Sequence, residues 1–183
     1  MVDAQVLRTY RLAVSASGEY TAYHGGTVAD ALAGINATLT RINEVFETDL
    51  GIRLELIGNN DQIIYTDAST DPYTGSLNSQ VQNTLTNVIG EANYDVGHLF
   101  HVANDNGNSG FIGAVCTDGD KGSAFTSAIT PEGDRFDLDF VSHELGHQFG
   151  ANHTWSHRSE GTTVQVEPAS CLLYTSPSPR DRG

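Results

Sequence analysis

The chain has 183 residues, of which 38% are hydrophobic and 17% charged. This composition suits one globular domain with a single core and argues against a disordered protein. Acidic residues outnumber basic ones by 23 to 9, so the formal net charge is −14. Nucleic acids and anionic membranes both bind basic surfaces, and we therefore do not expect either as a partner. Two cysteines do not make a disulfide framework.

The first half of the chain alternates predicted strands and helices. Alternating apolar and polar side chains indicate strands, and apolar side chains spaced by three or four residues indicate amphipathic helices. Thr27 is placed to cap the first helix, with Asp30 three residues further on. In chain order, the predicted elements are a strand at 6–15, a helix at 28–46, strands at 52–56 and 62–66, a loop at 67–76 and a helix at 77–89.

The second half begins with residues 96–102, a mostly apolar run typical of a buried central strand. A loop rich in glycine and asparagine follows at 104–110, and residues 111–116 form a short apolar segment that we interpret as an edge strand. A third helix is predicted to begin near Asp137 and to end at Gly150. Strands that alternate with helices in this way predict a sheet with helices packed on it.

The strongest chemical signal lies at residues 143–153, which read His-Glu-Leu-Gly-His-Gln-Phe-Gly-Ala-Asn-His. On a helix, His143 and His147 project from the same face and can bind one Zn²⁺ at about 2.0–2.1 Å. Glu144 lies one residue further round the helix, where its carboxylate can hold a water instead of the metal. The alternative is an ordinary helix with surface histidines, which does not account for the complete spacing.

A third metal ligand is expected from beyond the end of this helix. Gly150 can adopt the left-handed conformation that costs glycine little, so that the chain turns back and brings His153 to the metal. A fourth position left open for water marks a catalytic rather than a structural zinc. An apolar stripe should bury the opposite side of the helix and hold the histidines rigidly; it consists of Leu138, Val141, Leu145 and Phe149.

The extended pattern His-Glu-x-x-His-x-x-Gly-x-x-His resembles that of the metzincin metallopeptidases. Further segments resemble the bacterial reprolysin-like metallopeptidases, and the similarity extends over about residues 5–169. These segments are residues 8–13, 18–21, 64–67 and 93–98. Two features depart from the pattern. Thr154 occupies a position where adamalysin-type relatives have Asp, and the methionine turn expected beneath the zinc is not found, because Met1 is the only methionine.

The resemblance implies an α/β (α+β) fold: a metzincin-type upper subdomain with a twisted mixed sheet, packed helices and a zinc-binding active-site helix, with the lower subdomain missing. It implies His143, His147 and His153 as zinc ligands and Glu144 as the catalytic base that activates a zinc-bound water. The implied protein is a secreted zinc endopeptidase, although no signal-peptide pattern opens the chain, and we expect a monomer. Substrate should lie along the edge segment 110–115 by β-augmentation. An ordinary edge strand is the alternative for that segment.

Two other functions stay open at this point. A zinc hydrolase of another amide substrate would share the same site, and a non-catalytic adhesion module could retain a relict zinc site, although the intact Glu144 argues against that. Acidic residues between 118 and 139 could bind Ca²⁺, but they match no calcium-loop motif, and a solvated surface is the expectation.

Other polar and thiol side chains receive structural interpretations. His98 and His101 lie three residues apart in a predicted strand and should face opposite sides, so we do not expect them to share a metal. His157 is interpreted as a surface residue. Cys116 is interpreted as half of a disulfide or as a buried free thiol.

The end of the sequence differs from the rest. Residues 171–181 cluster Pro and Ser without periodicity and resemble the translation of a sequencing adapter. We therefore expect residues 1–170 to form an incomplete catalytic domain that lacks the methionine turn, and residues 171–183 to be a non-native tail. A Pro/Ser-rich linker is the alternative.

Overall fold

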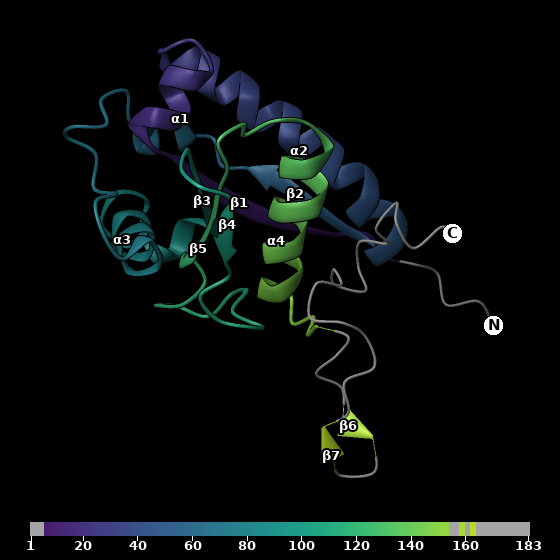
Figure 1. Ribbon diagram of the computed structural model, residues 1–183. Helices are drawn as coiled ribbons and strands as arrows, with labels where there is room; N and C mark the ends of the chain where they lie inside the picture. Colours follow the sequence, from purple (N-terminus) through teal and green to yellow (C-terminus); the bar gives the residue numbers. More distant parts are fainter. Residues whose placement is uncertain (1–5, 154–157, 160–161, 164–183) are drawn as a thin grey trace.

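The structure, a computed structural model, describes residues 6–153, 158–159 and 162–163 (Figure 1). Five strands form one twisted mixed sheet in the order β2-β1-β3-β5-β4. The first four are parallel to their neighbours, and β4 pairs antiparallel to β5. The strands are β1 Arg8–Ala16, β2 Ile52–Leu56, β3 Val96–His101, β4 Asn106–Asn108 and β5 Ala124–Ser127. A separate pair joins β6 Arg158–Ser159 to β7 Thr162–Thr163.

Helices cover both faces of the sheet. The α-helices are α1 Gly18–Tyr23, α2 Val28–Leu50, α3 Leu77–Thr84 and α4 Ser142–Gln148. The 3-10 turns are η1 Asn60–Ile63 and η3 Glu91–Asn93, and the π-helical segments are η2 Leu85–Ile89 and η4 Arg135–Val141. None of the described helices is long and apolar enough to cross a membrane. The mixed sheet with helices on both of its faces confirms the predicted α/β fold.

Two apolar clusters, one on each face, hold the layers together. On one face, alternate residues of β1 such as Leu12 and Val14 pack against α2 and α4. On the other face, Ala13 and Leu99 pack against α3 and η2. Because successive strand residues point to opposite faces, the register of β1 and β3 determines which helices each residue meets. Every residue of β3 is buried, as its apolar sequence predicts for a strand with neighbours on both sides.

The long helix α2 shows how local sequence sets the limits of an element. The Thr27 side chain accepts a hydrogen bond from the Asp30 backbone N–H at 3.2 Å, which confirms the predicted cap. The helix ends at Gly51, whose φ of 64° lies in the left-handed region. Its buried side recurs with helical spacing and lies on the sheet; it comprises Ala31, Ile35, Leu39, Ile42 and Phe46.

The prediction of a strand at residues 62–66 is wrong. The chain forms the turn η1 there, and a single bridge joins Ile64 to Ala16. The physical reason is the Asn60 side chain, whose amide accepts from Val14 N–H and donates to Val14 C=O, both at 2.8 Å. The amide thereby occupies part of the β1 backbone edge that an added strand would use.

The predicted edge strand at 111–116 is also wrong, because the edge strand is β4, which lies within the predicted loop at 104–110. Backbone N–H groups of Gly113 and Val115 donate instead to the carbonyls of His147 and Gln148, at the end of α4. Gly113 and Cys116 have positive φ angles of 75° and 64°, which prevent a continuous extended conformation. This segment therefore supports the end of the helix rather than the edge of the sheet.

Candidate metal centre

The helix that carries the histidine motif is continuous from η4 into α4, so it begins at Arg135, slightly earlier than predicted. Val141 and Leu145 of the predicted apolar stripe are buried in the core between α4, α2 and the sheet. Phe149 packs edge-on against Tyr10, with ring centroids 5.0 Å apart. Packing on this side orients the opposite side of α4, and with it the histidines, away from the core.

Two histidines of α4 and one that follows the helix lie close together. The nitrogens that His143, His147 and His153 offer as ligands all lie within 4.8 Å of one another. The Nε2 atoms of His147 and His153 are 3.2 Å apart. Two imidazole nitrogens bound to one tetrahedral Zn²⁺ at 2.0–2.1 Å would be separated by about 3.3–3.4 Å. The group is therefore close to the dimensions of a zinc site.

The turn after α4 brings the third histidine into place. Gly150 has a φ of 100°, its N–H donates to His147 C=O, and Ala151 N–H donates to Gly146 C=O, both at 2.9 Å. This pair of bonds is a Schellman motif with glycine at the left-handed position. The predicted role of Gly150 is confirmed, and the motif explains how His153 returns toward the helix within three residues.

The protonation states suit metal ligands. The His147 ring faces the Ala151 carbonyl through Nδ1 at 2.8 Å, and because a carbonyl only accepts, Nδ1 is the donor and Nε2 is the nitrogen directed at the other histidines. Burial lowers the pKa of His143 to about 4, with His147 and His153 as further causes, and burial also lowers the pKa of His153. Nδ1 of His143 is buried without a hydrogen-bond partner among the described residues. Neutral imidazoles in this arrangement fit a zinc ion.

Glu144 is buried beside the histidines and touches the edge strand. Burial raises the pKa of its carboxyl to about 7, although the backbone N–H of Ser109 donates to it and opposes the shift. A Cβ atom on Gly107 would lie 2.6 Å from Glu144 Oε1. Any larger residue at position 107 would therefore displace the carboxylate. Strand β4 thus forms one wall of the site.

Gln148 is a positioning residue of this helix that the sequence reasoning missed. Its fully buried amide donates to the carbonyls of Gly97 at 3.0 Å and Lys121 at 3.3 Å. Its Oε1 lies 3.3 Å from Nδ1 of His98, whose Nε2 meets Thr126 Oγ1 at 2.9 Å. These bonds tie the residue next to His147 to the sheet. The available signal was a long polar side chain next to a metal ligand in an apolar helix.

The remaining predicted polar residues lie elsewhere. His98 and His101 have separate partners: His98 Nε2 meets Thr126 Oγ1 at 2.9 Å, and His101 Nδ1 meets Ser17 Oγ at 2.8 Å. Among the described residues Cys116 has no disulfide partner, and its side chain is exposed, so the prediction of a buried thiol is wrong. Among the acidic residues, Asp118 pairs with Lys121 and Asp137 with Arg41. Thr154, His157 and the predicted tail 171–183 lie outside the described residues.

A mixed sheet that carries a helix with three converging imidazoles and a buried carboxylate is typical of metallopeptidases. The chain matches the model of the metallo-peptidase family M12B, reprolysin-like, over residues 6–181. The match extends over nearly the whole sequence, and the protein belongs to this family. Its members are zinc-dependent metallopeptidases, and the expected resemblance is confirmed. No curated protein matches the chain.

Proposed function

We propose that this protein is a zinc-dependent endopeptidase that hydrolyses peptide bonds of extended polypeptides. The observation that supports this proposal most directly is the convergence of three imidazoles within 4.8 Å, beside the buried carboxylate of Glu144. In this proposal His143, His147 and His153 hold the metal. A bound Zn²⁺ would supply Lewis acidity, which lowers the pKa of a water and polarises the scissile carbonyl.

Glu144 is the proposed general base. It accepts a proton from the attacking water and then donates that proton to the leaving amine. Proton exchange near neutral pH is easiest for a group whose pKa is close to 7. Burial raises the pKa of the Glu144 carboxyl to about this value. The Ser109 N–H and the Cα of Gly107 hold the carboxylate on the side that faces β4.

The proposed substrate position is the outer edge of β4, in place of the segment 110–115 that the sequence indicated. In the sheet, β4 has β5 as its neighbour on one side. An extended peptide can pair with such an edge through main-chain hydrogen bonds, which accept many sequences. A peptide there would lie next to Glu144, because Gly107 contacts both the edge and the carboxylate. We also propose that the protein acts outside the cell, in keeping with its family.

The test is the Glu144→Ala variant, assayed on a denatured protein after loading with zinc. Loss of a general base typically lowers a rate by about 10²–10⁴-fold, whereas the three metal ligands are untouched. We therefore expect one zinc per chain by elemental analysis and proteolysis reduced by at least about 100-fold. Unchanged proteolysis by the variant would contradict the role of Glu144, and a wild-type protein that binds zinc but cleaves no polypeptide would contradict the proposed function.

A further inference from the structure

A hollow lies on the opposite side of β4 from the metal centre. It is an open cleft of about 430 Å³ between α3 and the 119–123 loop, and Asn108 of β4 lines it. Asn108 is paired with Phe125 and Gly107 with Thr126, so these neighbouring residues of β4 point to opposite faces of the sheet. Gly107 faces Glu144, and Asn108 faces the cleft. One three-residue strand therefore separates the two sites.

The side chains that line the cleft are polar, and several are already committed to the structure. The Asn78 amide donates to the carbonyl of Ser123 at 2.6 Å, and the Gln82 amide oxygen accepts from Gly122 N–H at 2.7 Å. The amide of Asn83 and the carboxylate of Asp120 make no hydrogen bond or ion pair with the described residues. These two groups are available to a ligand.

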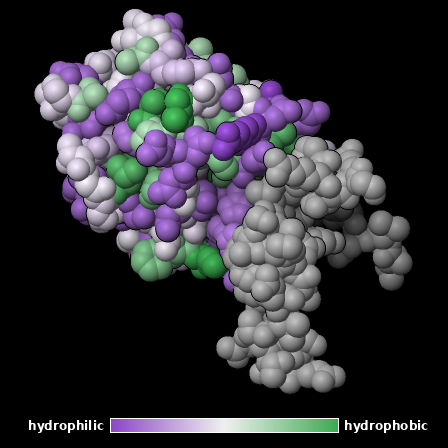
Figure 2. Space-filling model, in the orientation of Figure 1, coloured by the Kyte–Doolittle hydropathy of each residue, from purple (hydrophilic) through white to green (hydrophobic). Residues whose placement is uncertain are grey.

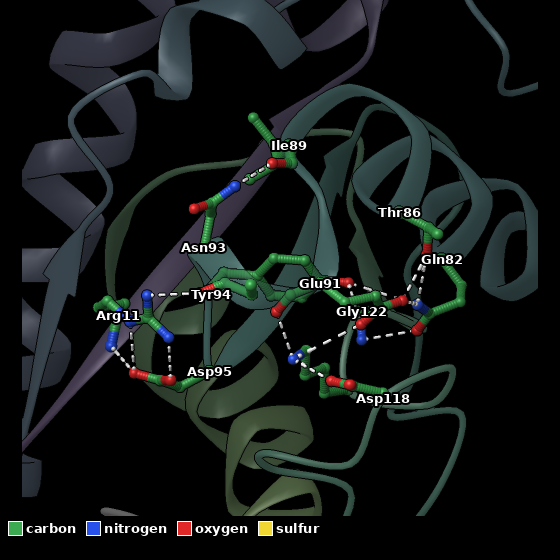
Figure 3. Close-up of polar contacts among 12 residues, drawn as sticks. Arg11, Gln82, Thr86, Ile89, Glu91, Asn93, Tyr94, Asp95, Asp118 and Gly122 are labelled. Carbon is green, nitrogen blue, oxygen red and sulfur yellow. Dashed lines mark hydrogen bonds and ion pairs between the residues drawn. The ribbon is translucent and has the colours of Figure 1, made fainter.

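The neighbouring lysine does not neutralise this carboxylate. Lys121 is buried, and its Nζ donates to Asp118 Oδ1 at 2.5 Å and to the Glu91 carbonyl at 2.6 Å (Figure 3). The ammonium also lies 4.9 Å above the Tyr94 ring. This network holds the 118–122 segment in place and keeps Nζ in contact with Asp118 and Glu91. Among the described residues that line the cleft, none is basic.

Phe111 lines the same cleft with 54% of its surface exposed. Figure 2 shows that hydrophobic residues form scattered patches among hydrophilic ones on this face of the molecule. A carboxylate and the face of an aromatic ring both attract a cation, the first by an ion pair and the second by a cation–π contact. The lining thus combines negative charge, a free amide and an aromatic ring. This combination fits the long cationic side chain of lysine or arginine.

We propose that this cleft is a substrate subsite that binds a lysine or arginine side chain, with Asp120 and Phe111 as the residues that determine the specificity. The proposal rests on the proposed endopeptidase function. Side chains of an extended peptide on the edge of β4 alternate between the two faces of the sheet. When one residue faces the metal centre, its neighbour faces the cleft, and this geometry predicts a basic preference at one fixed distance from the cleaved bond.

The experiment compares cleavage of a denatured protein mixture by the zinc-loaded wild type and by the Asp120→Lys variant, with the products sequenced by mass spectrometry. A partly exposed ion pair and a cation–π contact together predict about 10-fold enrichment of Lys and Arg at one position in wild-type products. In the variant, the same position should instead favour Asp and Glu, while the other positions stay unchanged. Asp49→Lys, at an exposed position of α2, makes the same change of charge outside the cleft and should keep the wild-type pattern.

Wild-type products without a basic preference, or an Asp120→Lys variant that keeps it, would overturn the subsite and leave the peptidase proposal intact. A second measurement does not depend on cleavage. The Glu144→Ala protein is titrated with Nα-acetyl-arginine amide and observed by NMR, with Nα-acetyl-glutamine amide as the control ligand. We expect shifts at the cleft residues for the arginine compound, with affinity about 10-fold weaker after Asp120→Lys. Equal shifts with both ligands, or none, would also overturn the inference.

Discussion

Two adjacent residues of α4, His147 and Gln148, lead into two polar clusters of opposite character. Gln148 belongs to a buried cluster in which every polar group has a partner: its amide meets Gly97 and Lys121 carbonyls, and His98 meets Gln148 and Thr126. The cluster of His147 instead brings ring nitrogens of three histidines within 4.8 Å of one another, with the Nε2 atoms of His147 and His153 3.2 Å apart. A polar network closed by protein partners stabilises a fold, whereas ring nitrogens gathered around one point are placed to share a ligand. The difference separates the part of α4 that anchors from the part that binds.

The largest effect is expected when one of the three clustered histidines is removed. His153→Ala should lower the affinity for Zn²⁺ by more than about 100-fold, since altering even an outer-shell partner of a zinc ligand costs about 10–100-fold. His101→Ala is the matched control, because His101 is buried but bonded to Ser17 away from the site. Competition with a chelator of known affinity measures both. Equal losses in the two variants would show that the three histidines are not a distinct metal site.

The anchoring cluster is tested by Gln148→Ala, which should reduce the free energy of unfolding by about 3 kcal/mol. The variant removes the donor to the buried Gly97 carbonyl and the partner of His98 Nδ1, while the Lys121 carbonyl keeps the Gly97 N–H at 2.7 Å; each unpaired buried group costs about 1–3 kcal/mol. Urea denaturation of the metal-free protein measures the change. A loss below about 0.5 kcal/mol, the size of an ordinary surface substitution, would show that Gln148 does not anchor the helix.

Gly107→Ala probes the contact between the edge strand and the base. A new Cβ would lie 2.6 Å from Glu144 Oε1, so the carboxylate must move while the fold is retained. A displacement near 1 Å can cost up to about 100-fold in rate, and we expect kcat to fall by about 50-fold with little change in KM. Gly58→Ala serves as control, because nothing lies within 4 Å of a Cβ there. A parallel loss in both variants would refute the positioning of Glu144 by β4.

The smallest expected effect is a pH dependence that arises in the anchoring cluster. Burial lowers the pKa of His98 from 6.5 to about 4, so the folded protein holds this ring neutral. Between these values the unfolded chain binds a proton that the folded chain does not, and stability is lost as the pH falls from about 6.5 through about 4. We expect about 2 kcal/mol less stability from this group at pH 5 than at pH 7.

The His98 ring can be observed directly by proton NMR, where its resonance should titrate near pH 4 in the folded protein. The pH dependence of unfolding should also be weaker in His98→Gln than in the wild type. A titration midpoint near 6.5 would mean that this ring is not excluded from water.

The sequence by itself determined the parts of this protein that depend on local spacing. Helical spacing placed His143 and His147 on one face, a glycine three residues past His147 allowed the turn that returns His153, and Thr27 began α2 as its cap predicts. Alternation and apolar runs likewise predicted β1, β2 and β3, because strand and helix periods are properties of neighbouring residues.

Only the tertiary structure decided which segments meet across the fold. The edge strand is β4 rather than 111–116 because the N–H groups of Gly113 and Val115 bond to the end of α4, and residues 62–66 are not a strand because the Asn60 amide pairs with β1. The contacts of Gly107 with Glu144 and of Gln148 with the sheet likewise join residues far apart in the chain. Such partners depend on long-range hydrogen bonding and packing, which local periodicity does not encode.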